Sequence, residues 1–257
     1  MKFDEILDRI ELLHTSNSDV ADLRRACIDN DVNSVFRLLE NLSESYIVTA
    51  LKHLHDDKKF NSDCLSRGQI KSKTWLVNEL KKIDGRTNIN LGTVFLCGGW
   101  YGTLATLLFE GDFNIDKIRS FDMDDSCWKI AETFNKPWVM KEWKFKSCTQ
   151  NIHDINYESH TYNVFRADGS SCELTDSPDT IINTSTEHIE NFADWYSKIP
   201  QNKLLILQGS DWQDGEGHIN CTKDAEHFAE MTPMKDILFA GALQTEKYTR
   251  YMRIGYK

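Results

Sequence analysis

The feature that most constrains this chain is a short apolar run that leads directly into a glycine-rich turn. The segment VFLCGGWYGTLA spans residues 94–105, and its second half has helical character. Glycine lets the backbone approach a ligand closely, and a helix N-terminus favours a polar or anionic group. Such turns occur in many nucleotide-binding folds, so the segment predicts a cofactor site at Gly98, Gly99, Trp100, Tyr101 and Gly102.

An acidic segment, DMDD, follows the next strand candidate at residues 122–125. Asp122 lies about twenty residues beyond Gly102, where a carboxylate can accept hydrogen bonds from both hydroxyls of a ribose. We therefore expect Asp122 or Asp124 to bind ribose, with Met123 beside them. The alternative is that these acidic residues only cap the helix that follows.

Apolar runs and helical segments alternate from residue 91 onward. The strand candidates are residues 93–97, 118–121, 143–148, 180–182, 204–207, 237–239 and 248–256. Strands that alternate with helices predict a parallel sheet covered on both faces. The last two candidates suggest a hairpin, so the predicted fold is α/β: a Rossmann-like, seven-stranded, mostly parallel sheet with an antiparallel last strand.

The first part of the chain has a different pattern. Apolar residues follow helical spacing at Phe3, Ile6, Leu7, Ile10 and Leu13, and again between residues 32 and 42. We therefore predict a helical N-terminal region over residues 1–85 and a second domain over residues 86–257.

These ordered elements resemble the class I S-adenosylmethionine-dependent methyltransferases over roughly residues 90–257, and the chain looks similar to methyltransferase-like proteins of tailed phages. Asp154 follows the third strand, where that family often places an acidic side chain near the adenine amino group. The segment DTIINTSTEHI, residues 179–189, is similar to the family's fourth strand and the start of its next helix. The resemblance implies S-adenosylmethionine as cofactor, S-adenosylhomocysteine as product, and cofactor contacts from Asn183 and Thr184.

The first motif departs from the family pattern. Leu96 stands where the family has an acidic residue, and Trp100 stands where it has its middle glycine. We therefore expect Trp100 or Tyr101 to pack on the methionine part of the cofactor. Bulky side chains in the turn also narrow the approach for a pyrophosphate, which weighs against NAD or FAD.

Methyl transfer requires mainly in-line positioning of the nucleophile and the methyl group, because the sulfonium is already an electrophile. Glu187 and His188 are the catalytic candidates at the expected edge of the cofactor pocket. The ordinary pKa of histidine lies near neutrality, so His188 suits a general base. Alternatively, Glu187 caps the helix and His188 packs beneath the cofactor.

Three other segments are candidates for the site. Gln69, Lys71 or Lys73 could hold the cofactor carboxylate or an anionic substrate, or simply begin a helix. The long connections at residues 155–178 and 209–221 are candidate substrate walls, with surface decoration as the alternative. The second connection contains Asp211, Asp214, Glu216 and His218, which match no calcium-loop spacing, so no metal site is predicted.

Composition narrows the possible partners. The formal net charge of -10 argues against a large nucleic-acid footprint, and no apolar run approaches a membrane span. The N-terminal MKFDEILDRI is too charged for a signal peptide, and seven scattered cysteines indicate a reducing cytoplasm. The expected function is methyl transfer to a small molecule or a protein side chain. The alternatives are a catalytically inactive cofactor-binding module and a nucleotide-dependent oxidoreductase.

Overall fold

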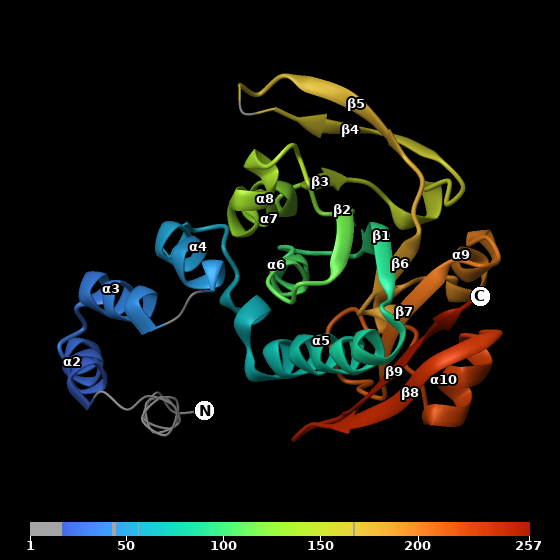
Figure 1. Ribbon diagram of the computed structural model, residues 1–257. Coiled ribbons are helices and arrows are strands. Elements are labelled where there is room, and N and C mark those ends of the chain that lie inside the picture. The colour runs from blue at the N-terminus through green and yellow to red at the C-terminus, as the bar shows by residue number, and fades with distance from the viewer. Residues whose placement is uncertain (1–16, 43–44, 56, 167) are drawn as a thin grey trace. The chain divides into compact units, whose positions relative to one another are not determined.

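The computed structural model of the chain describes residues 17–42, 45–55, 57–166 and 168–257 (Figure 1). The chain divides into two compact units, Met1–Ser62 and Asp63–Lys257. The helical spacing noted at residues 3–13 lies outside the described residues. No helix in the described ranges combines the length and the apolar character that a membrane crossing requires.

The first unit contains three described helices, α2 (Asn17–Ile28), α3 (Val32–Leu42) and α4 (Tyr46–Leu54). Helix α2 packs on α3, and α3 packs on α4. The hydroxyl of Ser45 accepts a hydrogen bond from the Ile47 amide and caps α4.

The second unit begins with the short helix η1 (Ser62–Leu65) and the long helix α5 (Arg67–Thr87). The buried stripe of α5, formed by Leu76, Val77, Leu80 and Ile83, is part of the core of this unit. The sequence placed α5 in an N-terminal region that ends at residue 85, but in the structure α5 belongs to the second compact unit. The reason is that its apolar stripe is buried against the sheet, a contact that helical spacing alone does not reveal.

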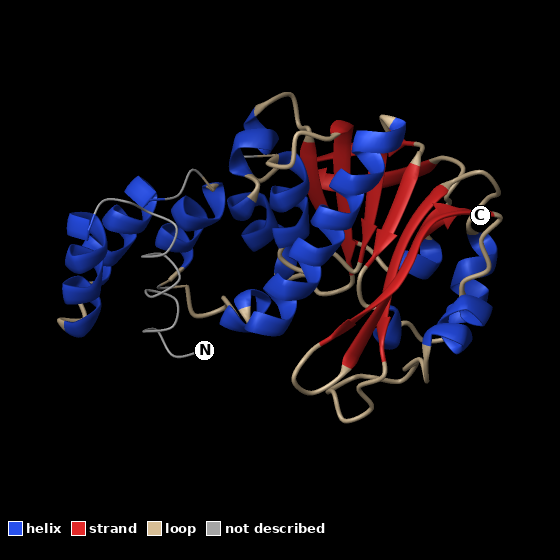
Figure 2. Cartoon of the chain, turned by 60° about the horizontal axis from the view of Figure 1, so that its bottom comes forward, coloured by secondary structure: helices blue, strands red, loops and turns tan. Residues whose placement is uncertain are grey.

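A seven-stranded sheet forms the centre of the second unit (Figure 2). Its order is β3-β2-β1-β6-β7-β9-β8. The strands are β1 (Asn90–Cys97), β2 (Asn114–Asp122), β3 (Phe145–Thr149), β6 (Thr180–Asn183), β7 (Leu204–Ser210), β8 (Asp236–Gln244) and β9 (Thr249–Tyr256). Strands β1, β2, β3, β6 and β7 are parallel, whereas β9 is antiparallel to both of its neighbours. The predicted sheet, including its antiparallel last strand, is confirmed.

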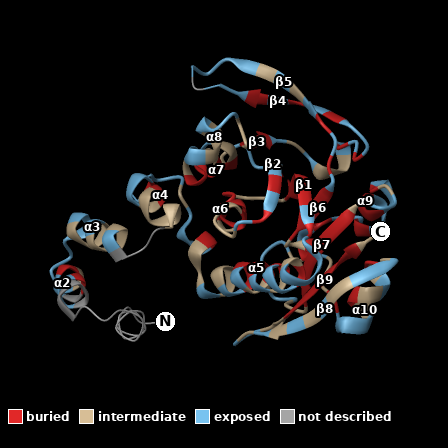
Figure 3. Cartoon of the chain, in the orientation of Figure 1, coloured by how far each residue is buried: buried red, intermediate tan, exposed pale blue. Residues whose placement is uncertain are grey.

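The inner strands of the sheet are mostly buried (Figure 3), and their alternate residues place their side chains in two separate cores. In β1, Val94 and Leu96 join one core, and Phe95 and Cys97 join the other. The first core packs against α5, α6 (Thr103–Phe109), α7 (Cys127–Phe134) and α8 (Lys136–Met140). The second packs against α9 (Phe192–Lys198) and α10 (Ala225–Met231). Burial on both faces explains why these strands appear in the sequence as continuous apolar runs.

A β-hairpin of β4 (His160–Phe165) and β5 (Ser171–Asp176) covers part of the second core near β2 and β3. Asp176 joins the hairpin to β2, because its carboxylate accepts hydrogen bonds from Arg119 at 2.8 Å, Lys117 at 2.8 Å and Tyr162 at 2.5 Å. Burial favours a higher pKa for Asp176, but the three hydrogen bonds outweigh it and hold the pKa below its usual value.

We expect Asp176→Asn to lower the free energy of unfolding at pH 7 by about 3 kcal/mol, because it leaves the buried Arg119 without its counter-charge. The native pKa of Asp176 lies below its unfolded value, so its stabilising contribution is present above pH ~4 and is lost as the pH falls further. Urea unfolding at several pH values measures this difference. Glu173→Gln, on the exposed side of the same strand, should change little. Equal stabilities of the two variants at pH 7 would contradict this role for Asp176.

Candidate functional site

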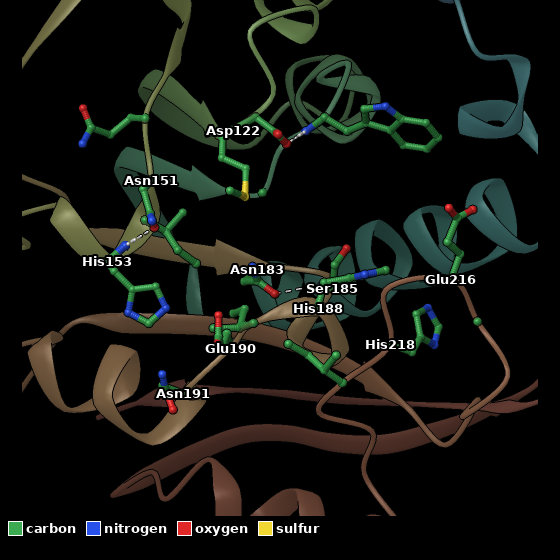
Figure 4. Close-up of a pocket in the computed structure, with 18 of the residues that line it drawn as sticks. Asp122, Asn151, His153, Asn183, Ser185, His188, Glu190, Asn191, Glu216 and His218 are labelled. Atoms are coloured by element: carbon green, nitrogen blue, oxygen red, sulfur yellow. Dashed lines mark hydrogen bonds between the residues drawn. The ribbon is translucent and has the colours of Figure 1, made fainter.

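The candidate site is a cavity of about 1180 Å³ at the carboxyl ends of the parallel strands (Figure 4). Residues at or just beyond the end of each parallel strand line the cavity. They are Gly98 after β1, Asp122 at the end of β2, Gln150 after β3, Asn183 at the end of β6 and Trp212 after β7. An open α/β sheet binds its ligands at this edge. The complete lining also includes residues of η1, α5 and α9.

The glycine-rich turn forms one wall of the cavity. The amides of Gly98 and Gly99 both donate to the carbonyl of Phe121, at 2.8 and 3.2 Å, which ties the turn to β2. Gly102 begins α6 with a φ of 66°, a conformation that favours glycine. Gly98 and Trp100 line the cavity.

Asp122 links the end of β2 to this turn. Its Oδ2 accepts a hydrogen bond from the Trp100 amide at 2.8 Å, and its Oδ1 accepts one from the Asp124 amide at 3.1 Å. Burial raises the pKa of Asp122. Met123 also lines the cavity. Asp124 does not, because its carboxylate accepts from the Ser126 amide at 2.8 Å at the start of α7.

The connection after β3 does not bring Asp154 to the cavity, in contrast to the prediction from the sequence. Asp154 is exposed and is not among the lining residues; instead Gln150, Asn151, Ile152 and His153 reach the cavity. The side chain of Asn151 accepts a hydrogen bond from the His153 amide at 3.0 Å and starts the short helix η2 (Ile152–Asp154). This turn leaves Asp154 at its far end.

The segment after β6 divides its polar residues between the cavity and the core. Asn183 is buried at the cavity wall, where it donates to the Cys97 carbonyl at 2.8 Å and accepts from the Ser185 amide at 2.9 Å. Thr184 does not line the cavity; its carbonyl accepts from Arg250 at 2.7 Å.

The two catalytic candidates lie in η3 (Thr186–His188) and have different surroundings. Glu187 is only 1% exposed and does not line the cavity; its Oε1 accepts from Arg250 at 3.1 Å and from Ser210 at 3.2 Å. His188 does line the cavity, 4.5 Å from His218 between ring centroids. Burial lowers the pKa of His188, Glu187 opposes that effect, and His218 adds to it. Of this pair, only His188 is among the residues that line the cavity.

The two long connections play different parts. The connection at residues 209–221 contributes Trp212, Gly215, Glu216, His218 and Ile219 to the cavity, as expected for a substrate wall. The hairpin within residues 155–178 contributes none of the lining residues, so its interpretation as a second wall is wrong. Its apolar face instead covers the second core.

Of the three polar residues proposed near the start of α5, Gln69 lines the cavity. Lys71 donates to the Gln244 carbonyl at 2.9 Å, and the buried Lys73 donates to Gln69. Burial and the nearby Arg250 lower the pKa of Lys73 to about 8. Lys73 therefore orients Gln69 from behind and does not line the cavity itself.

Sequence reasoning missed most of the walls formed by irregular segments. The residues that it did not propose include Asp63 of η1, Asn151 and His153 after β3, and Asn191, Ala193 and Asp194 near the start of α9. Of the predicted cofactor residues, Gly99, Tyr101 and Gly102 shape the turn without lining the cavity. Position after a parallel strand was the signal that could have found Gln150 and Asn151.

Replacing Gly102 in the turn should destabilise the fold much more than replacing Gly85 on the surface of α5. A Cβ at Gly102 would lie 2.8 Å from Asn135 Nδ2 and would also require a non-glycine residue at positive φ, so we expect Gly102→Ala to destabilise the fold by about 1–3 kcal/mol. The control, Gly85→Ala, meets no atom within 4 Å and should stabilise by up to ~1 kcal/mol. Denaturant unfolding compares the two variants. A Gly102→Ala protein as stable as the parent would show that the turn tolerates a side chain.

No family model and no curated protein matches the sequence. Among solved structures, the chain is similar to a protein from Galdieria sulphuraria provisionally assigned as a sarcosine dimethylglycine methyltransferase, with a TM-score of 0.52 and 11% identity, covering 74% of this chain and 86% of that one. A geranyl diphosphate methyltransferase in complex with GPP and sinefungin matches with a TM-score of 0.50 and 8% identity, over 73% and 77% of the two chains.

The N-methyltransferase NodS from Bradyrhizobium japonicum WM9, in complex with S-adenosyl-L-homocysteine, also matches with a TM-score of 0.50 and 11% identity. That match covers 82% of this chain and 99% of the other. These are similarities of the overall fold, at sequence identities of 11% or less. The chain therefore has the Rossmann-like fold of the class I S-adenosylmethionine-dependent methyltransferases.

Proposed function

We propose that this chain is an S-adenosylmethionine-dependent methyltransferase that transfers the methyl group directly to a small-molecule acceptor. The observation that carries the proposal is the joint between Asp122 and the glycine-rich turn. Asp122 accepts from the Trp100 amide at 2.8 Å, so the carboxylate and the turn meet at one end of the cavity. This arrangement suits a ribose bound at Asp122 and the rest of a nucleoside cofactor along the turn.

The other parts of the cofactor have matching partners along the cavity. Asn151 and Ile152, beyond β3, offer a polar and an apolar group for the adenine. Gln69, oriented by Lys73, faces the cavity from α5. Leu96 is buried in the core and supplies no carboxylate for the cofactor's amino group, so we assign that contact to Asp63, the acidic residue that η1 contributes to the lining.

Two observations favour this cofactor over a dinucleotide. Trp100 lines the cavity in the turn itself, where a pyrophosphate would need close access to the backbone. The antiparallel β9 beside β7 is the extra strand implied by the methyltransferase resemblance. Together they disfavour the oxidoreductase alternative.

The size and charge of the cavity favour a small acceptor. Its volume of about 1180 Å³ exceeds the ~300–1,000 Å³ typical of a single small-molecule site, which leaves space for a second molecule beside the cofactor. Its walls carry several carboxylates, including Glu190, Asp194 and Glu216, which would repel a polyanionic nucleic acid. Two of the solved structures described above are named for small substrates, sarcosine and dimethylglycine in one and geranyl diphosphate in the other.

Direct transfer needs the acceptor's nucleophile in line with the methyl–sulfur bond. The new bond forms to the methyl carbon as the carbon–sulfur bond breaks, and S-adenosylhomocysteine leaves as a neutral thioether. Trp212 and His188 are part of the wall that would exclude water from this step. Catalytic turnover with an acceptor distinguishes this proposal from the alternative of an inactive cofactor-binding module.

We expect Asp122→Asn to weaken S-adenosylmethionine binding by at least tenfold, about 1.4 kcal/mol, because an amide offers only one acceptor oxygen to the two ribose hydroxyls. The remaining oxygen can still accept from the Trp100 amide, whereas the hydrogen bond from the Asp124 amide to the other oxygen is lost. Calorimetric titration measures the affinity. Asp125→Ala, an exposed change in the same segment, serves as the control and should bind like the parent. Unchanged affinity in a folded Asp122→Asn protein would remove Asp122 from the cofactor site.

A further inference from the structure

We propose that Glu187, His188 and His218 form a binding site for a divalent metal ion at the cavity wall. Each residue offers one ligand atom, and the three atoms lie within 4.8 Å of one another. His188 and His218 stand side by side in the cavity, and Glu187 precedes His188 in the chain (Figure 4). Two imidazoles and one carboxylate are a common ligand set for first-row divalent metals.

The connection after β7 is folded so that His218 meets η3. The amides of Ile219 and Asn220 both donate to the Glu187 carbonyl at 2.9 Å, which fixes the connection against η3. A Cβ at Gly215 would lie 2.4 Å from His218 Nδ1, so a side chain there would displace the His218 ring from its position. The position of His218 is therefore built by specific contacts.

Both histidines have the orientation that metal ligands usually show. Nδ1 of His188 lies 3.1 Å from the Gly217 carbonyl, and Nδ1 of His218 lies 2.5 Å from the Trp212 carbonyl. A carbonyl oxygen only accepts, so each Nδ1 carries the proton and each Nε2 keeps its lone pair. Metal-binding histidines typically donate their other ring nitrogen to a carbonyl or carboxylate in this way.

The carboxylate of Glu187 supplies an independent indication of a ligand. Its Oε1 accepts from Arg250 and Ser210, whereas its buried Oε2 has no hydrogen-bond partner among the residues that the structure describes. Leaving a buried carboxylate oxygen unsatisfied is costly. A cation at this oxygen removes that cost, and the contact with Arg250 holds the carboxylate in place.

The donor set selects a borderline cation such as Zn²⁺, Mn²⁺, Fe²⁺ or Co²⁺ over Mg²⁺ or Ca²⁺, which prefer oxygen ligands. Metal–ligand bonds of about 2.1 Å require ligand atoms roughly 3–3.5 Å apart, so the three ligand atoms, which lie within 4.8 Å of one another, would move closer together on binding an ion. Three protein ligands leave at least one open position, as in catalytic metal sites.

The coordination position that the three protein ligands leave open gives the ion a role within the cavity. A bound cation would hold an oxygen of the acceptor and lower the pKa of that group. This role rests on the proposed function, whereas the metal site itself does not. His188 would then be a metal ligand and would not be the general base that the sequence predicted.

Titration of the chelator-treated, full-length protein with Co²⁺ tests the site without any cofactor or acceptor. We expect one Co²⁺ per chain by calorimetry, together with the visible absorption of Co²⁺ bound by nitrogen and oxygen ligands. His188→Ala and His218→Ala should each weaken binding by at least about tenfold. The matched control is His153→Ala, which removes a histidine of the same cavity outside the proposed ligand set and should bind Co²⁺ like the parent.

Absence of stoichiometric Co²⁺ binding to the parent protein would overturn the proposal, and this result does not depend on how any variant folds. Loss of binding in His153→Ala equal to that in His218→Ala would also overturn it, because the ion would then bind elsewhere in the cavity. A separate titration of the metal-free protein with S-adenosylmethionine reports on the proposed function, so either claim can fail alone.

Discussion

The buried ion pair between Glu187 and Arg250 is the interaction on which the site depends. It joins η3, after the central strand β6, to the antiparallel strand β9, with the Arg250 and Glu187 side chains 7% and 1% exposed. Arg250 also donates to the Thr184 carbonyl, while the Glu187 carbonyl anchors the connection after β7. Glu187 thus uses its side chain to fix η3 on the sheet and its backbone carbonyl to fix the adjacent connection after β7.

This arrangement explains why a polar site can stand on an apolar sheet. The strands bury both faces in two cores, so their side chains cannot serve a ligand along most of their length. Only where the parallel strands end do polar residues emerge, and there they are tied to one another: Asp122 to Trp100, and Asn183 to the Cys97 carbonyl. The cavity walls are therefore preorganised by neighbouring strand ends.

The sequence predicted the elements whose signals are local. Each strand is a short apolar run bounded by turn residues, and the joint between Gly98 and Asp122 follows from spacing along a strand–turn–helix unit. Features that depend on distant contacts were missed. Asp154 follows the right strand, but the turn started by Asn151 leaves it outside the cavity. The hairpin of β4 and β5 was predicted to be a substrate wall because the sequence shows the length of this connection. The sequence does not show that the hairpin packs on the second core.

The proposed metal site is the clearest example of a feature that depends on contacts between distant segments and was missed from the sequence. From the sequence, His218 was grouped with Asp211 and Asp214 because the three residues lie in the same connection after β7. In the structure Asp211 accepts from the Thr249 amide at 2.8 Å, and His218 meets His188 from another strand end. Ligands brought together by backbone hydrogen bonds between two loops leave no spacing signature. The sequence therefore predicted no metal site, and the proposed ligand set depends on the fold.

The central claim is that the cavity binds an adenosyl cofactor. Calorimetric titration of the parent protein with S-adenosylmethionine, S-adenosylhomocysteine, NAD and NADP tests it most directly. We expect micromolar binding of the two adenosyl ligands and no binding of the dinucleotides, because Trp100 lies in the turn that a pyrophosphate would approach. Binding of a dinucleotide, or of none of the four, would contradict the methyltransferase function.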